Sequence, residues 1–261
     1  MLSSRHPLIP ALVKLDQHAT LTEADRSAFL DLPVRCQTFK AGGYVARQGE
    51  RVRSVGVVLS GFAYGSKVTS NGARQIISVH MPGDLISVQH AAFRKATSSI
   101  QMMTPGDVAL ISADDLDALV AERPDVQRAV WLSTLVDGSI ASEWVVNVGR
   151  RDARSRIAHL LCEFATRLKA VRSDREIAYE FPMTQEQVGD ATGLTSVHVN
   201  RTLQDLRRNG LIRHDNRTVT IADWKALTAV GDFQAEYLKQ DDVQAETSRH
   251  RVEQTALSNG R

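Results

Sequence analysis

Residues 182–222 read PMTQEQVGDATGLTSVHVNRTLQDLRRNGLIRHDNRTVTIA, and they predict two helices joined by a tight turn. Thr184 and Gln187 have the spacing of a capping box, which starts the first helix. Gly193 ends that helix, because glycine adopts the left-handed conformation without strain. Thr195 then caps a second helix, which continues to the next Asn-Gly pair.

The second helix has an apolar back and a polar, basic front. Val199, Leu203 and Leu206 recur at helical spacing, so we expect them to be buried. Two short β-like runs follow at Leu211–His214 and Val219–Ile221 and predict a hairpin. A helix, a glycine turn, an amphipathic helix and a hairpin together predict a winged helix-turn-helix.

This pattern favours binding to duplex DNA, because the major groove admits one α-helix and displays a hydrogen-bond code on its base edges. Arg201, one turn into the second helix, has the planar fork that matches guanine O6 and N7. The alternative is a helical hairpin that only packs, with Arg201 as a solvated charge. The predicted base-reading residues are Ser196, Val197, Asn200 and Arg201, and the predicted phosphate contacts are Thr184, Gln185, Thr195, His198, Gln204 and Arg208.

The first half of the chain has short β-like runs separated by glycine turns. Asn71–Gly72 between two such runs is a strong hairpin signal, because both turn positions favour positive φ. Many short strands at regular spacing predict a small β-roll, with helices at Leu21–Leu32 and Ser112–Glu122. The predicted strands are Val34–Phe39, Tyr44–Gln48, Val55–Leu59, Phe62–Val68, Arg74–Met81, Ser99–Thr104 and Asp107–Ile111.

A long helix is predicted over Asp125–Val148, which contains no proline. Its residues at alternating spacings of three and four resemble a coiled-coil seam, and leucines lie on another face as well. We therefore expect the seam to contact a second copy of the chain; the alternative is that the helix lies on its own domain. The predicted dimerisation residues are Val130, Ile140, Trp144 and Val148.

The predicted fold class is α+β, in four segments. Residues 1–122 form a β-roll sensor domain with N-terminal helices, and residues 123–149 form the dimerisation helix. Residues 150–240 form the winged helix-turn-helix domain, which begins with a second amphipathic helix at Arg151–Lys169 and a polar connector at Val171–Ile177. Residues 241–261 have mixed charge and few large apolar side chains, so we expect a disordered tail.

Composition excludes several other classes of protein. The 261 residues carry a net charge of +2, but residues 150–217 hold 13 basic and nine acidic residues, which suits a polyanionic partner for this segment. No apolar run approaches the ~18 residues of a membrane span, so we expect a cytoplasmic protein without a membrane partner. A β-roll metalloenzyme is a further alternative, but it needs a His-x-His pair, which the sequence lacks. No metal site and no catalytic residue are predicted.

Over roughly residues 20–230 the chain resembles the Crp/Fnr family of bacterial transcription regulators. The family's glycine marks are present, in order, as Gln48-Gly49-Glu50, Leu59-Ser60-Gly61, Asn71-Gly72 and Pro82-Gly83-Asp84. The resemblance implies a homodimer on a pseudo-palindromic operator, with the roll as a sensor and RNA polymerase as a partner.

The signal at the roll is not identified by the resemblance. Relatives that bind cyclic nucleotides carry Arg-Ser or Arg-Thr after the Pro-Gly-Asp turn, whereas this chain aligns Ala96-Thr97 there, and a buried cyclic phosphate needs a cation. Iron–sulfur relatives use four cysteines, and this chain has only Cys36 and Cys162. We therefore expect no cofactor, with a cyclic nucleotide or haem as alternatives. The possible axial ligands for haem are His6, His18, His80, His90 and Cys36.

The recognition helix also departs from the family pattern. Many relatives carry a glutamate one turn before the arginine, where it accepts a hydrogen bond from cytosine N4. Val197 stands in that place and can only touch a thymine methyl, while Asn200 can pair with adenine. We expect this chain to keep the guanine contact of Arg201 and to read a different neighbouring base.

Overall fold

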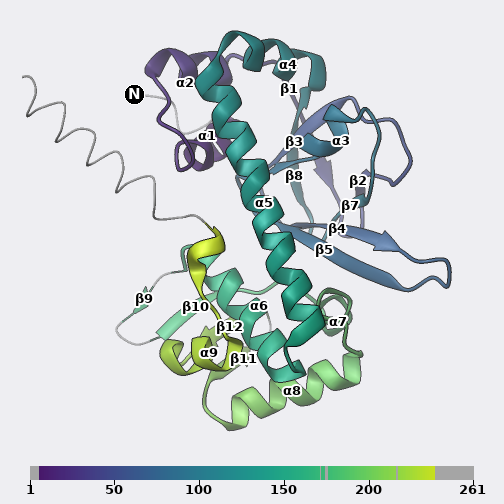
Figure 1. The fold of residues 1–261 in the computed structure, drawn as a ribbon, viewed down its shortest axis with the longest axis vertical. Coiled ribbons are helices and arrows are strands. Elements are labelled where there is room, and N and C mark those ends of the chain that lie inside the picture. Colours follow the sequence, from purple (N-terminus) through teal and green to yellow (C-terminus); the bar gives the residue numbers. More distant parts are fainter. Residues whose placement is uncertain (1–5, 171, 174–175, 216, 239–261) are drawn as a thin grey trace, which may run out of the picture.

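The computed structural model describes residues 6–170, 172–173, 176–215 and 217–238, and the tail predicted at 241–261 lies outside these residues. A β-roll and a smaller, helix-rich unit lie along one long helix, α5 (Pro124–Arg150) (Figure 1). The α+β class and the order of the parts are confirmed.

The roll consists of two four-stranded antiparallel sheets, with strand orders β1-β8-β3-β6 and β2-β7-β4-β5. All seven predicted runs are strands, and the short β6 adds an eighth. Gly72, at the tip of the β4–β5 hairpin, has φ +84°, as the Asn-Gly signal predicts. The strands are β1 (Val34–Phe39), β2 (Tyr44–Ala46), β3 (Ser54–Val58), β4 (Ala63–Val68), β5 (Arg74–His80), β6 (Leu85–Ile86), β7 (Ser99–Met102) and β8 (Gly106–Ser112).

Short helices border the roll: α1 (Ile9–Leu15), α2 (Glu23–Leu30), α3 (Val88–Ala92) and α4 (Ala113–Glu122). The capping box that starts α2 is the one between Thr22 and Asp25. The first turns of α5 bury apolar side chains in the same core as these helices. The roll therefore encloses its own hydrophobic core and uses the beginning of α5 to close it.

The C-terminal unit contains the predicted helix-turn-helix and wing. Its first helix, α6 (Ala153–Arg167), is buried along most of its length. One part of the prediction is wrong: the polar connector at Val171–Ile177 overlaps two strands, because Ile177 and Tyr179 alternate inward and the strand that holds them pairs with the wing. The other elements are β9 (Arg172–Ser173), β10 (Glu176–Glu180), α7 (Gln185–Thr192), α8 (Ser196–Arg208), β11 (Ile212–Asp215), β12 (Thr218–Ile221), α9 (Trp224–Gly231) and η1 (Ala235–Leu238).

The predicted dimer seam on α5 faces the chain's own domains. Val130, Ile140 and Trp144 are only 8%, 7% and 6% exposed, and Val148 is half-buried. The indole N–H of Trp144 donates to Glu163 Oε2 of α6 at 2.9 Å. These side chains pack within one protomer and leave little surface for a second copy, so their packing does not support this face as the dimer seam, and its role in dimerisation stays a prediction.

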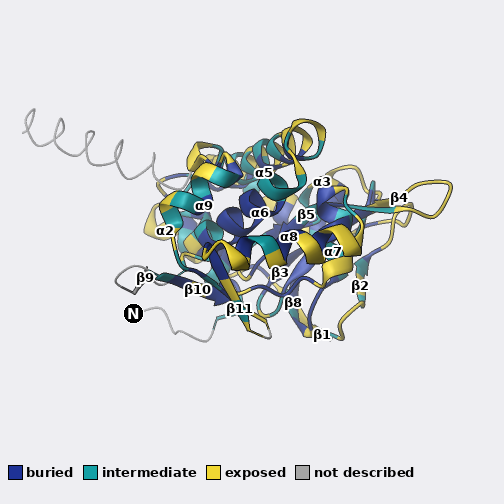
Figure 2. Ribbon diagram, turned by 90° about the horizontal axis from the view of Figure 1, so that it is seen from below, coloured by how far each residue is buried: buried dark blue, intermediate teal, exposed yellow. Residues whose placement is uncertain are grey.

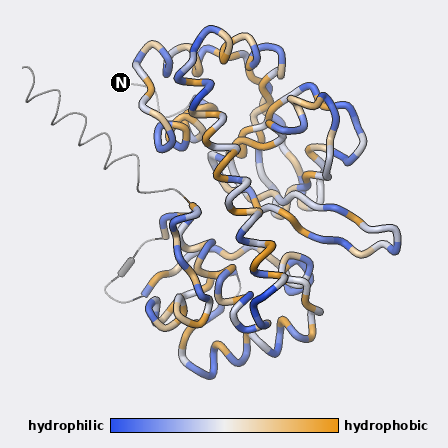
Figure 3. Tube along the Cα trace, in the orientation of Figure 1, coloured by the Kyte–Doolittle hydropathy of each residue, from blue (hydrophilic) through white to orange (hydrophobic). Residues whose placement is uncertain are grey.

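The exposed apolar side chains of α5 lie on a different face. Trp131, Leu135 and Val145 are 57%, 47% and 73% exposed, and Val146 lies beside them. Apolar segments recur along this helix in Figure 3. The helix thus has an inner apolar face that packs within the chain and an outer one that nothing in the described part of the chain covers.

Candidate nucleic-acid interface

The first helix of the motif, α7, starts at the predicted capping box. Thr184 Oγ1 accepts from the backbone N–H of Gln187 at 3.2 Å, and Gln187 Oε1 accepts from the backbone N–H of Thr184 at 2.9 Å. This arrangement leaves the threonine O–H free to donate. Thr184 and Gln185 are both exposed at this helix end, where backbone N–H groups and the helix dipole favour phosphate.

The turn between α7 and α8 depends on two glycines. Gly193 has φ +68°, which confirms the left-handed turn predicted there. A Cβ atom on Gly189 would lie 2.4 Å from the carbonyl oxygen of Leu194, whose own N–H donates to Gly189 O at 3.0 Å. The turn therefore folds back tightly onto α7, and this contact fixes the angle between the two helices.

The second helix, α8, presents the predicted front to solvent. Thr195 Oγ1 caps it by accepting from the His198 N–H at 3.3 Å. Seen from below, α7 and α8 carry exposed residues on the side toward the viewer (Figure 2). The predicted back of Val199, Leu203 and Leu206 is buried, and the predicted front of Ser196, Val197, Asn200 and Arg201 is exposed.

The remaining predicted phosphate contacts continue along this front. His198 lies in the first turn of α8, and Gln204 and Arg208 are exposed farther along. Gln204 Nε2 donates to Asn200 Oδ1 at 3.4 Å, which holds the two amides side by side. The structure brings these side chains together on one surface, and their contacts with bases and phosphates stay predictions.

One basic residue of this surface was not predicted from the sequence. Arg154, near the start of α6, makes an ion pair with Asp205 of α8 at 3.4 Å. Arg208 pairs with the other oxygen of the same carboxylate at 3.6 Å. The only local sequence signal is Asp152, which caps α6 by accepting from the Ser155 N–H. The resulting shallow groove, about 490 Å³, is lined by Asp152, Ala153, Arg154, His198, Arg201, Thr202, Asp205 and Arg208.

The wing is held to the strand beside it by charge. Arg213 of β11 donates to Glu176 of β10, with one N–O distance of 2.8 Å, and these hydrogen bonds lower the pKa of Glu176. Arg207 of the neighbouring helix α8 lies 2.8 Å from Nδ1 of His214, which is on β11. The hairpin therefore has a fixed position next to the recognition helix, as a wing requires.

A second candidate site is a cavity of about 370 Å³ between β5, α3 and α5. His80 and His90 both line it. Burial lowers the pKa of His90 and lowers that of His80 to about 4, so both rings are neutral near pH 7. His80 Nε2 lies 3.0 Å from Ser78 Oγ, and His90 Nε2 lies 3.2 Å from Ser98 Oγ. Among the described residues, His90 Nδ1 has no hydrogen-bond partner although it is buried.

The lining of this cavity does not fit a cyclic phosphate. Arg167 is the one lysine or arginine among the described residues that line it, and its guanidinium already serves two carboxylates and a backbone carbonyl. Arg94 follows the cavity residue His90 closely in sequence, but it is paired with Asp114 and Asp117 at 2.8 Å each. Asp137 of α5 lines the cavity and is partly open to solvent. Restricted solvation there, together with Asp84, raises its pKa to about 7.

Within the described ranges, no group of three or more His, Cys, Asp or Glu side chains has the arrangement of a metal site. In the same ranges, no helix is long and apolar enough to span a membrane. Cys162 is fully buried in α6, and burial raises the pKa of its thiol well above the ordinary value, as expected for a packing residue. Cys36 is exposed on the roll.

A capped recognition helix, a wing and a β-roll joined by one long helix are the parts of a DNA-binding transcription regulator with a separate β-roll domain. Residues 36–123 match the cyclic nucleotide-binding domain family, and residues 155–230 match the Crp-like helix-turn-helix domain family. The chain belongs to the Crp/Fnr family of transcription regulators, and the resemblance stated from its glycine marks is confirmed.

Individual relatives agree with this assignment. A probable transcriptional activator of Rhizobium leguminosarum bv. viciae is 27% identical over 189 residues, which span 72% of this chain and 78% of that protein. The transcriptional activator protein FnrL of Cereibacter sphaeroides is 26% identical and aligns over 75% and 80% of the two chains. The structure of FixK2 from Bradyrhizobium japonicum has a TM-score of 0.70 at 22% identity and covers 78% of this chain and 100% of that one, which shows the shared fold.

Proposed function

We propose that the protein is a cytoplasmic homodimer that binds a pseudo-palindromic operator and acts by binding rather than catalysis. The observation that carries the proposal is the exposed front of α8, with Arg201 one turn from a capped helix end and without an ion pair in the part of the chain that the structure describes. Relatives described as transcriptional activators support RNA polymerase as a further partner. Selection of binding sites from random DNA tests the proposal: the enriched sequences should be inverted repeats with half-sites about one helical turn apart.

The outer face of α5 supports the dimer. Trp131, Leu135, Gly138, Ser142 and Val145 follow one another at spacings of four and three, which is the pattern of a two-helix seam. The small residues in the middle let two helices approach closely. This face replaces the predicted one, and the two α5 helices of a dimer would run side by side along it.

Three neighbouring side chains determine the base preference. Arg201 pairs with guanine, Asn200 pairs with adenine, and Val197, which is 80% exposed, contacts a thymine methyl. An apolar side chain so fully exposed is unusual on a polar front, and a DNA partner would bury it. The half-site therefore contains a thymine where relatives with glutamate at this place select cytosine.

Replacing Val197 tests this readout. The Val197→Glu variant is expected to change the preference at one base pair from thymine to cytosine, by about 1–3 kcal/mol. Gln204→Glu makes the same change of charge farther along α8, so it is expected to weaken binding without changing the preferred base. Both variants and the wild-type protein are compared by selection from random DNA. Enrichment of one identical half-site by wild type and Val197→Glu would contradict the assignment.

The effector of the roll is a small molecule that is neutral or basic and carries hydrogen-bond donors. Two neutral histidines, the unpartnered His90 Nδ1 and Asp137 on the cavity wall support this chemistry, since each can accept a hydrogen bond from a ligand. We expect no resident cofactor. Native mass spectrometry tests for a retained ligand, titration with cyclic AMP tests the cyclic-nucleotide alternative, and an absorbance spectrum with a haem band would support haem on His80 or His90.

A further inference from the structure

One strand of the roll, β5, is fastened to the DNA-binding unit at its first residue. Arg74 Nε lies 2.6 Å from Asp190 Oδ2 of α7, and Arg74 Nη2 lies 3.1 Å from Glu186 Oε1 of the same helix. The amide of Gln75 donates to the carbonyl oxygen of Ala191 at 3.3 Å. The first helix of the helix-turn-helix is thus held by side chains of the roll at three points.

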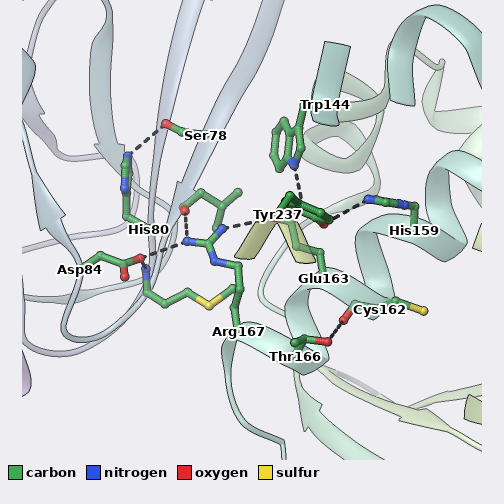
Figure 4. Close-up of polar contacts among 12 residues, drawn as sticks. Ser78, His80, Asp84, Trp144, His159, Cys162, Glu163, Thr166, Arg167 and Tyr237 are labelled. Carbon is green, nitrogen blue, oxygen red and sulfur yellow. Dashed lines mark hydrogen bonds and ion pairs between the residues drawn. The ribbon is translucent and has the colours of Figure 1, made fainter. Parts of the chain in front are cut away.

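The other end of β5 is fastened to α6. Arg167 donates to the carbonyl oxygen of Val79 at 2.8 Å and to Asp84 Oδ2 at 3.1 Å, and it also pairs with Glu163 at 3.2 Å (Figure 4). Burial disfavours the ionised form of Asp84, but Lys14 and Arg167 outweigh this effect and lower its pKa to about 2. The ion pair of Asp84 and Arg167 is therefore a charged link between the two domains at all physiological pH values.

Apolar packing continues between these two fastened ends. Ile76, Val79 and Met81 belong to the same buried cluster as Leu161 and Phe164 of α6. In Figure 1, β5 lies above α7, whereas α8 lies at the end of the molecule remote from the roll. The docking thus leaves the recognition front free while it fixes the helices behind it.

The same strand is also a wall of the effector cavity, through residues 77–80. The unit that carries α8 also meets the long helix at two other places: η1 lies against its middle, where Leu238 and Ile140 line one cavity, and further contacts lie close to the bend between α5 and α6. Close to the bend, Arg151 pairs with Glu143 at 2.6 Å, and the Trp144 indole donates to Glu163. The contacts of Arg74 differ from these because they join α7 directly to the roll, so they restrict the orientation of the helix-turn-helix relative to β5.

We propose that Arg74 and Arg167 are positioning residues for DNA recognition: they dock α7 and α6 on β5 and so set the orientation in which α8 enters the groove. A dimer must place two such helices in the DNA at once. A unit that is not docked on β5 has more orientational freedom to lose on binding than a docked one, so its affinity for DNA is lower. The inference rests on the proposed dimer and adds to it the strand that connects the effector cavity with the DNA-binding helices.

The test compares Arg74→Gln with Arg94→Gln. Both arginines belong to the roll, and each pairs with two carboxylates. Those of Arg74 are on α7, whereas those of Arg94, Asp114 and Asp117, lie within the roll itself. Arg74→Gln is expected to lower affinity for the selected operator by about 5-fold or more, which is the lower end of typical coupling between sites. Affinity for non-specific DNA at low salt should stay unchanged, and Arg94→Gln should behave as the wild-type protein on both DNAs.

Asp190→Asn tests the same link from α7. If the ion pair is the positioning contact, Arg74→Gln/Asp190→Asn should lose no more operator affinity than Arg74→Gln alone. Equal operator affinity for Arg74→Gln and Arg94→Gln would overturn the inference. So would an equal loss on operator and non-specific DNA, which would make Arg74 a phosphate contact. A wild-type protein that selects no sequence would overturn the proposed function, and the inference with it.

Discussion

The Arg201→Ala variant is expected to lose discrimination between the operator and other sequences while its fold and oligomeric state remain unchanged. The side chain is exposed and makes no ion pair within the described residues, so its removal leaves no buried group without a partner. A bidentate arginine–guanine contact contributes about 1–3 kcal/mol of discrimination. Because a dimer makes the contact twice, the free energy of binding to the operator should become less favourable by about 2–6 kcal/mol, with little change on non-specific DNA.

Competition binding with operator and scrambled duplexes measures this loss, and Arg208→Ala provides the control. Arg208 lies farther along α8, where we expect it to contact phosphate rather than base. Its removal should weaken binding to both duplexes equally and make the salt dependence shallower by about one unit of slope per half-site. Unchanged discrimination in Arg201→Ala would move base recognition to another part of the surface.

The recognition helix was predictable because its signals are local. A capping threonine, a glycine with positive φ and an apolar stripe at helical spacing act within one or two turns, and the structure has each where the sequence indicates it. The orientation of the front follows from the same stripe, since burial of Val199 and Leu203 turns Asn200 and Arg201 outward. Local patterns therefore determined the candidate DNA surface.

The contact face of α5 was not predictable in the same way. The residues Val130, Ile140 and Trp144 and the residues Trp131, Leu135 and Val145 both recur at spacings typical of a seam. A helix with two apolar faces needs two partners, but its sequence does not say which face meets which partner. Tertiary structure alone shows that α6 packs against Trp144, so that this face meets the chain's own domain.

Arg154 and Arg74 were missed because tertiary structure alone gives them their roles. Arg154 is some fifty residues from its partner Asp205, and Arg74 is more than a hundred from Asp190. Neither position differs, in sequence, from an ordinary surface arginine. Strand β10 was missed because it is short and polar on one face, and its pairing with the wing supplies the rest of its stabilisation.

The two faces of α5 can be separated by one pair of variants. Leu135→Asp places a charge on the outer face and is expected to raise the dimer dissociation constant about 100-fold or more, because burial of a leucine contributes about 1.5–3 kcal/mol and the twofold axis counts it twice. Phe93→Asp is the control, since Phe93 is 61% exposed at the end of α3 on the roll and lies outside α5. Sedimentation velocity measures the oligomeric state, and Leu135→Asp should also fail to bind a full operator.

Trp144→Ala is expected to act on folding instead. Its indole is 6% exposed and donates to Glu163 Oε2, so truncation leaves a cavity and removes one of the two hydrogen bonds to that oxygen, the other of which comes from the Tyr237 hydroxyl. A loss of about 3–5 kcal/mol in the free energy of unfolding follows from the cavity alone. Thermal unfolding separates this effect from dimerisation, because the outer face of α5 is unaltered in the variant. If Trp144→Ala were monomeric at undiminished stability while Leu135→Asp stayed dimeric, the seam would lie on the inner face, and α6 would have to move away from α5 when two chains associate.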